Sequence, residues 1–235
     1  MKISYDLHIH SCLSPCGSDD MTPNNIMNMA WIKGLDVVAI TDHNSGKNVS
    51  ACVGIGNDLG VLVLPGMEVQ TREEVHVLCY FPHVKNLETF ETELDLYRMQ
   101  IPNRPDRFGN QWIMNDKDEV VGEMPLALIL SIDLSIDDLY ALVERYEGIM
   151  IPAHVNKDSN SILYNLGFIP PHLAFTTLEV MKNKEISDVL KNNFAYIYNS
   201  DAHYLEDISE PENFLEVESK TIGSVIKALK RKELK

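Results

Sequence analysis

Apolar residues recur along the chain in two alternating patterns, one typical of strands and one typical of helices. Residues 3–9 (ISYDLHI) alternate apolar and polar side chains as a strand does, and residues 35–41 (LDVVAIT) form the β-branched run of a buried strand. Between them a helix is predicted, with Thr22 as N-cap, Pro23 at its first position and Gly34 just past its end. Such strand–helix units predict a mostly parallel sheet covered by helices.

The same alternation continues to the end of the chain. The strands predicted at 61–71 and 74–81 share such a short link that we expect them to be antiparallel or to share a corner. Residues 86–99 repeat apolar side chains at helical spacing. The further predicted elements are helices at 135–146, 161–166 and 184–193, strands at 149–155, 176–181 and 195–203, and a C-terminal helix to Lys232.

Residues 101–131 interrupt this rhythm. The segment shows no hydrophobic period and contains three prolines, Pro102, Pro105 and Pro125. Long aperiodic segments in compact domains are often functional lids, so we predict a lid-like insertion here.

Length and charge narrow the function. A chain of 235 residues suits one domain, residues 1–235, because α/β barrels reach this size without splitting. The formal net charge is −15, from 35 acidic and 20 basic residues, which argues against a duplex-DNA partner. A small anionic substrate, either a phosphorylated metabolite or a short oligonucleotide, is compatible only if cations in the site offset the acidic surroundings.

Nothing in the sequence predicts export or membrane insertion. No apolar run reaches the roughly 18 residues that a membrane helix needs, and the N-terminus enters a strand-like segment with charges. The four cysteines then suit reduced thiols, and we expect a cytoplasmic protein. The oligomeric state is not predicted.

Histidines gather at the ends of the predicted strands. In parallel α/β folds these ends open on one face, where ligands bind, and a closed barrel brings the first and last strands together there. His8 and His10, two apart on one strand, point the same way. The other members of the set are His43, Glu68, His76, His154, Asp201 and His203.

Each position alone has an ordinary explanation. His154 could be a hydrogen-bonded core histidine, Glu68 could pair with Arg72, and Asp201 could close a turn. Burying so many imidazoles and carboxylates together without a cation is costly, so the whole set favours a metal centre. The mixed donors suit two or three ions of Zn, Mn or Fe. Metal pairs about 3.5–4 Å apart supply a bridging hydroxide for phosphoryl transfer.

The ordered motifs DLHIHS, AITDHN, GMEV, EVHVLCYF, IPAHV and SDAHY resemble those of the polymerase and histidinol phosphatase (PHP) superfamily, from Asp6 to about Tyr204. The resemblance implies a distorted seven-stranded (β/α) barrel and a stand-alone, metal-dependent phosphoesterase. It implies a first metal held by His8, His10, Glu68 and Asp201.

The resemblance also implies further metals. Glu68 would bridge to a second metal held by His76 and His154, and His43 and His203 would bind a third. The loop after the first motif departs from the family pattern, and three residues could complete the third site. They are Cys16, as a thiolate ligand, and Asp19 or Asp20.

The predicted reaction is hydrolysis of a small phosphate monoester or a short oligonucleotide phosphodiester by a hydroxide that bridges two metals. Glu68 and Asp42 are the candidate catalytic residues, Asp42 as a proton shuttle or as an acceptor that orients a ligand imidazole. The candidate phosphate contacts, which could equally be solvated surface charges, are Arg104, Arg107 and Lys157.

Two other functions stay open. The first is a C–N hydrolase like the related amidohydrolases, although these more often use a bridging lysine where this chain has Glu68. The second is a catalytically silent metal-binding regulatory module.

Overall fold

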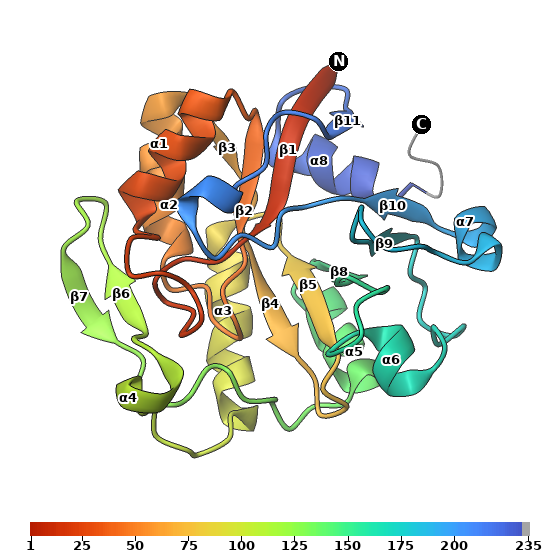
Figure 1. Cartoon of the computed structure of the whole chain (residues 1–235), viewed down its shortest axis with the longest axis horizontal. Helices are drawn as coiled ribbons and strands as arrows, with labels where there is room; N and C mark the ends of the chain where they lie inside the picture. Colours follow the sequence, from red (N-terminus) through yellow and green to blue (C-terminus); the bar gives the residue numbers. More distant parts are fainter. Residues whose placement is uncertain (232–235) are drawn as a thin grey trace.

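The computed structural model describes residues 1–231, which form a mixed α/β fold of several small sheets with helices outside them (Figure 1). The first sheet has the order β11–β1–β2–β3. Its parallel strands are β1 (Lys2–Ile9), β2 (Val37–Ile40) and β3 (Leu62–Val63), and β11 (Phe214–Glu216) pairs antiparallel with β1.

The second sheet is antiparallel and has the order β4–β5–β8. Strands β4 (Gly66–Gln70) and β5 (His76–Tyr80) are joined by the short link, so the prediction that they are antiparallel is confirmed. Strand β8 (Ile149–Pro152) pairs with the other edge of β5. Two-stranded sheets complete the set: parallel β9 (Thr177–Glu179) and β10 (Ala195–Ile197), and antiparallel β6 (Trp112–Met114) and β7 (Val120–Glu123).

The predicted seven-stranded (β/α) barrel is not confirmed, since residues 1–231 form four separate sheets. Isolated parallel bridges link the sheets, at Ile9–Ala202 and at His43–Glu68. The physical reason is that the antiparallel β5 interrupts the parallel order and that strands β9 and β10 are only three residues long. Side chains take over where ladder bonds are missing, as Asn199 does when it accepts the Leu7 N–H at 2.8 Å.

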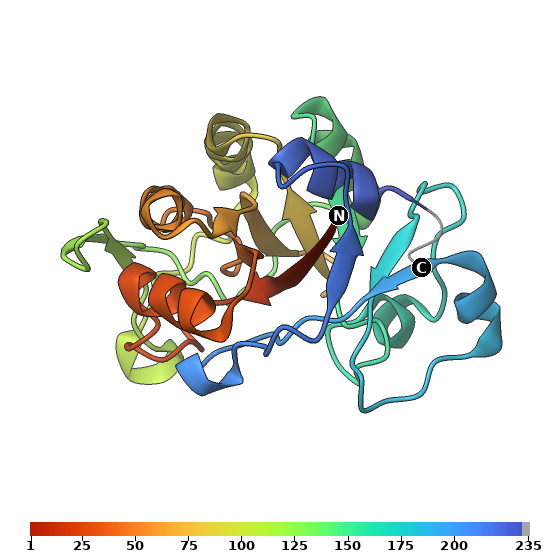
Figure 2. The same ribbon diagram turned by 90° about the horizontal axis from the view of Figure 1, so that it is seen from above.

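The helices follow the predicted boundary signals. Helix α1 (Pro23–Lys33) has Thr22 as N-cap, whose hydroxyl accepts the Asn25 N–H, and Gly34 ends it at φ 77°. Seen from above, the longer helices lie outside the strands (Figure 2). The others are α2 (Val49–Leu59), α3 (Val84–Leu94), α4 (Pro105–Phe108), α5 (Ile136–Arg145), α6 (Ile162–Leu166), α7 (Asp188–Asn193) and α8 (Ile222–Leu229), with short 3-10 turns at Asp95–Tyr97 and Leu205–Asp207.

Two predicted helices are shorter than expected. The helix predicted at 184–193 begins only at Asp188, and the C-terminal helix ends at Leu229, while Lys232 lies outside the described residues. Within the described part of the chain, no helix has the length and apolar character needed to cross a bilayer.

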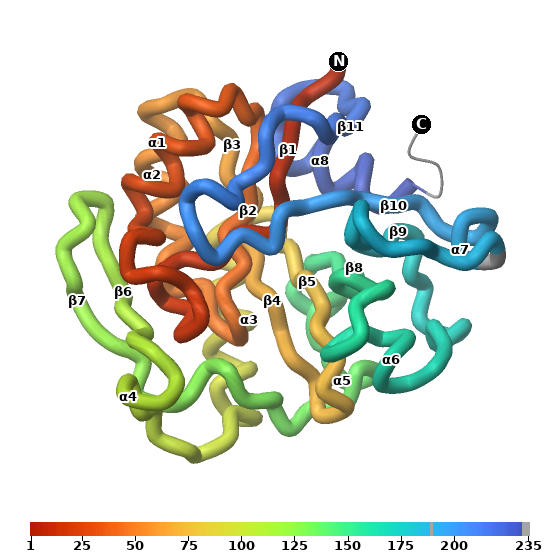
Figure 3. The backbone as a smooth tube through the Cα atoms, in the orientation of Figure 1, coloured from red at the N-terminus to blue at the C-terminus, as the bar shows by residue number. Residues whose placement is uncertain are grey.

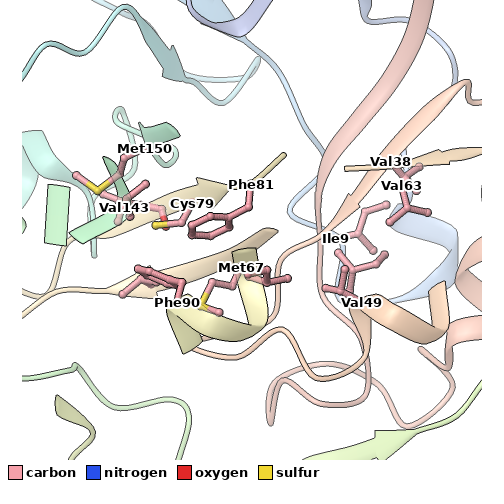
Figure 4. Packing of buried hydrophobic residues seen from close by; sticks show 14 of the residues in the cluster. Ile9, Val38, Val49, Val63, Met67, Cys79, Phe81, Phe90, Val143 and Met150 are labelled. Atoms are coloured by element: carbon pink, nitrogen blue, oxygen red, sulfur yellow. The ribbon is translucent and has the colours of Figure 1, made fainter. Parts of the chain in front are cut away.

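The larger apolar cluster lies between the sheets and the outer helices. Phe81 and Phe90 pack with ring centroids 4.8 Å apart, near Met67 of β4 and Cys79 of β5 (Figure 4). Burying these side chains contributes roughly 1.5–3 kcal/mol each. This packing fixes β4, which carries Glu68, and β5, which carries His76.

Residues 101–131 form an arm that includes the β6–β7 hairpin and runs beside the first loops of the chain (Figure 3). The Asp118 carboxylate accepts the Thr22 hydroxyl at 2.6 Å and the Asn24 N–H at 2.9 Å. Asn48 donates to the Trp112 carbonyl at 3.1 Å. The arm is therefore anchored to the N-termini of α1 and α2.

We expect Gly109→Ala to lower the free energy of unfolding by about 2 kcal/mol or more, because φ near 104° is strained for alanine by roughly 1–3 kcal/mol. The added Cβ would also lie 2.0 Å from the Pro15 carbonyl oxygen, in the loop before Cys16. Urea denaturation measures the change.

Gly122→Ala, in strand β7 of the same arm, is the matched control. Its Cβ would meet only the Ile113 side chain, at 3.6 Å, so we expect a change within about 0.5 kcal/mol. Equal stability of the two variants would contradict the packing of the arm on the Pro15 loop.

Candidate metal centre

The first two histidines meet at the end of β1. His8 and His10 are fully buried, and their Nε2 atoms lie 3.1 Å apart. Asp201, in the loop after β10, places Oδ1 at 3.3 Å from both Nε2 atoms. The ring of His203 stacks on His10 at a centroid distance of 4.3 Å. The structure thus brings together residues about 190 positions apart in the chain.

Glu68 lies at the middle of the cluster. Its Oε1 lies 2.8 Å from His76 Nδ1 and 3.3 Å from His154 Nε2. Its Oε2 lies 3.0 Å from His43 Nδ1 and 3.4 Å from His10 Nε2. A single carboxylate therefore faces imidazoles from four different segments.

Among residues 1–231, three groups of donors lie close enough to hold a cation each, with ligand atoms within 4.8 Å of one another. Two of these groups share His10 and two share His43, so the three positions adjoin. The groups are His8, His10 and Asp201; His43, Glu68 and His76; and His10, His43 and His203.

The backbone at this face is turned sharply. His154 has φ 29° and Asp201 has φ 54°, both in the left-handed region that costs non-glycine residues free energy. Both follow strand ends, β8 and β10 respectively. The turn directs each side chain into the cluster, and strain of this kind is typical of functional sites.

His8 lies between carboxylates. Its Nδ1 lies 2.9 Å from the Glu179 carboxylate, which can only accept, so the ring donates there. Burial lowers the pKa of His8, but Glu179, Asp201 and Glu68 outweigh it and raise the pKa well above its usual range. Within residues 1–231, four buried cluster atoms have no partner in hydrogen-bond geometry: His43 Nδ1 and Glu68 Oε2, which lie 3.0 Å from each other, and His76 Nε2 and His154 Nδ1. Unpaired buried donors and acceptors are costly, and the donor set fits a cation that would satisfy them.

Charges within the cluster shift its pKa values in both directions. Burial raises the pKa of Glu68, but His76, His8 and His43 outweigh it and hold the pKa well below its usual range. Burial lowers the pKa of His43, but Glu68 and Cys16 outweigh it and raise the pKa to about 10. Burial lowers the pKa of His10, and His43 lowers it further. The ionised Glu68 thus lies beside both protonated and neutral imidazoles, and a cation would displace the protons, because metal ligands are deprotonated.

Of the three candidates for the third site, Cys16 lies beside the histidines. Burial raises the pKa of its thiol, but hydrogen bonds with His203 and His43 bring it down to about 7. Asp19 instead accepts from Asn110 at 3.0 Å on the surface, and Asp20 is exposed.

The candidate catalytic residue Asp42 lies behind the cluster. It is fully buried and accepts hydrogen bonds from Ser11 and Ser14. Burial raises its pKa, and these hydrogen bonds act against that rise.

The three candidate phosphate contacts differ in position. Lys157 lies at the cluster, with Nζ 3.2 Å from Asp201 Oδ2. Arg104 and Arg107 are exposed on the arm, where Arg104 pairs with Asp106 of α4 at 3.0 Å.

Sequence reasoning missed Glu179 at the end of β9. Its carboxylate accepts from His8 Nδ1, from the His154 N–H at 2.8 Å and from Asn199 at 2.7 Å. Glu179 thus fixes two predicted ligands at once. The sequence does contain a signal for Glu179. It is an acid inside an apolar strand (LEV), as Glu68 is in GMEV.

No protein-family model matches this chain. A 76-residue match is 38% identical to an uncharacterized protein of Methanocaldococcus jannaschii and covers 29% of this chain and 44% of that protein. A 78-residue match is 35% identical to a phosphoribosyl 1,2-cyclic phosphate 1,2-diphosphodiesterase of Eggerthella lenta and covers 31% of this chain and 29% of that enzyme. Each match therefore spans less than half of the curated relative.

Solved structures are similar over nearly the whole chain. A lesion-specific endonuclease, endonuclease Q, of Pyrococcus furiosus has a TM-score of 0.69 at 21% identity and is matched over 98% of this chain and 56% of its own. A two-domain protein of Bacteroides vulgatus that contains a predicted PHP-like metal-dependent phosphoesterase has a TM-score of 0.61 at 16% identity, over 99% and 63%. An amidohydrolase of Chromobacterium violaceum has a TM-score of 0.59 at 17% identity, over 96% of both chains. The chain has a PHP-like α/β fold, which supports the resemblance drawn from its motifs.

The exclusion of duplex DNA was wrong. Endonuclease Q has also been solved with a 27-mer duplex substrate whose abasic lesion lies at the active site, at a TM-score of 0.70 and 21% identity. The fold is thus compatible with a duplex. Net charge alone does not decide the point, because it does not tell where the charges lie; acids such as Asp42, Glu68 and Glu179 are buried at the cluster and do not face the surface.

We expect iodoacetamide to alkylate Cys16 before the other thiols at pH 8, because its pKa of about 7 leaves mostly thiolate. Burial raises the pKa of Cys12 to about 12, and Cys52 and Cys79 are buried, so these thiols should react slowly. Lowering the pH below about 7 should slow the modification of Cys16.

Zinc should protect Cys16 if the thiolate binds a cation together with His43 and His203. Peptide mass spectrometry after timed alkylation, with and without zinc, measures both effects. Equal modification of Cys16 in the two samples would contradict a thiolate ligand.

Proposed function

We propose that this chain, which has a PHP-like fold, is a metal-dependent phosphoesterase, a hydrolase that acts on ester bonds. The observation that carries the proposal is the buried cluster around Glu68, in which imidazole nitrogens and carboxylate oxygens from distant segments lie within 3.5 Å of one another. Several of these buried atoms are left without a hydrogen bond, which is costly unless a cation satisfies them.

The proposed ligands are those that the resemblance implies, and they overlap the three groups of donors. His8, His10, Glu68 and Asp201 would hold one cation, and Glu68 would bridge to a second at His76 and His154. A third would lie between His43, His203 and Cys16. Imidazole and carboxylate donors suit Zn, Mn or Fe, and two or three ions can be accommodated.

When bound, the cations supply Lewis acidity and lower the pKa of water, which gives a nucleophile near neutral pH. The chain's own residues hold the geometry for this chemistry. Glu68, 1% exposed, is fixed by hydrogen-bonded neighbours, and the surrounding burial limits water. Lys157, about one-third exposed beside Asp201, can donate to a phosphate oxygen at the opening of the cluster.

The cavity beside the cluster favours a small phosphorylated group. It has a volume of about 290 Å³, and His154, Glu179 and Asp201 line its inner end. Lys182 and Asn183 also line it and offer polar groups. This volume lies at the low end of small-molecule sites, so it suits a phosphate monoester or one nucleotide of a longer strand.

A C–N hydrolase is the second candidate, favoured by the structural likeness to an amidohydrolase over 96% of both chains. We rank it lower because the bridging position is filled by Glu68 and not by a lysine. A catalytically silent metal-binding module is the remaining alternative.

We expect the metal-free protein to hydrolyse p-nitrophenyl phosphate or its bis ester only after Mn, Zn or Fe is added back. His8→Ala should lower kcat by at least about 100-fold. Even the loss of a residue that only contacts a metal ligand lowers metal affinity or activity roughly 10–100-fold. Circular dichroism verifies that the fold is retained.

His172→Ala is the matched control, since His172 is exposed and pairs with Asp137 away from the cluster. Monoester activity indicates a phosphatase and diester activity a nuclease-like enzyme, which duplex DNA with an abasic site then tests directly. Near-normal turnover of His8→Ala would refute the proposal, and hydrolysis of neither ester by the wild type would favour the two alternatives.

A further inference from the structure

The Ser14 hydroxyl lies between a predicted metal ligand and a buried carboxylate. Ser14 Oγ is 2.9 Å from His10 Nδ1 and donates to Asp42 Oδ1 at 2.7 Å. It also accepts the backbone N–H of His43 at 3.0 Å. Ser14, His10 and Asp42 are fully buried, so water does not substitute for any of these partners.

The number of protons on Ser14 restricts the arrangement. A hydroxyl has one proton to donate and two lone pairs. The His43 N–H occupies one lone pair, because a backbone amide can only donate. One proton and one lone pair remain for Asp42 and His10. If Asp42 is ionised, it accepts the Ser14 proton, and the remaining lone pair of Ser14 accepts the Nδ1–H of His10.

The neighbours of Asp42 favour its ionised form. The Ser11 hydroxyl accepts from Asn48 Nδ2 at 2.9 Å and from the Leu13 N–H at 3.2 Å, so its own proton goes to Asp42 Oδ2 at 2.6 Å. The Ser11 N–H donates to Asp42 Oδ1 at 2.7 Å. With Ser14 added, Asp42 receives three hydrogen bonds, an arrangement that stabilises a carboxylate.

We propose that Ser14, held by Asp42, accepts the Nδ1 proton of His10 and so positions its Nε2 lone pair toward a cation. The inference rests on the proposed function. His10 Nε2 lies 3.3 Å from Asp201 Oδ1 and 3.4 Å from Glu68 Oε2, in the first of the donor groups.

Both members of the H-x-H pair thereby have an acceptor on Nδ1, Glu179 for His8 and Ser14 for His10. Asp42 is then a positioning residue that acts through Ser14.

The first test is the zinc affinity of Ser14→Ala, measured by competition with a chromophoric chelator. The variant leaves a buried Nδ1–H without an acceptor, so we expect the affinity to fall about 10- to 100-fold. Ser45→Ala is the matched control. It likewise removes a fully buried hydroxyl that donates to a buried carboxylate, Glu91 at 2.6 Å, but it contacts neither Asp42 nor Ser14, and its zinc affinity should stay close to that of the wild type.

The second test needs no variant. Nitrogen-15 NMR of the zinc-loaded wild type should show His10 with a slowly exchanging proton on Nδ1 and zinc on Nε2. A His10 ring protonated on Nε2 would overturn the proposal.

Equal zinc affinities of Ser14→Ala and Ser45→Ala would also overturn it, even where His8→Ala abolishes hydrolysis and the phosphoesterase function stands. A wild type that binds no zinc would instead overturn the proposed function together with this inference.

Discussion

The electrostatics of one buried carboxylate determine the organisation of this protein. Glu68 is almost completely buried, yet His76, His8 and His43 hold its pKa well below the usual range. A charge in that position is tolerable only where cations or imidazoles surround it on all sides. This environment is formed by the strand ends, by the sharp backbone turns at His154 and Asp201, and by the hydrogen-bond acceptors behind the imidazole rings.

The broken sheet is part of how the cluster is held. A fully parallel barrel would place every strand end at equal spacing, whereas here β4 and β5 run antiparallel, so Glu68 and His76 come from neighbouring strands. Where the ladder stops, the buried Glu179 and the half-buried Asn199 take over its hydrogen bonds, and Glu179 also contacts His8 of the cluster. The loss of regular sheet thus gives positions from which side chains can orient the imidazoles.

Charge acts locally in this protein. The net charge of −15 includes buried acids at the cluster, where each divalent cation would add two positive charges. Lys157 already lies against Asp201 at the opening of the cluster. Local charges of this kind, rather than the total, set the field at the opening of the cluster, so the net charge by itself does not exclude a duplex.

The sequence by itself determined most of the elements, though not α4, β6 and β7 within residues 101–131, and it singled out the residues that meet around Glu68, though not Glu179. Local signals such as Thr22 at the start of α1 and the short link between β4 and β5 depend on neighbouring residues, so they could be read directly. The tertiary structure decided what depends on distant contacts: the separate sheets, the place of Cys16 beside His43 and His203, and the acceptors Ser14 and Glu179 behind His10 and His8. Glu179 lies 171 positions from His8, and no local pattern encodes which carboxylate meets which ring, because hydrogen-bond partners are set by the folded geometry.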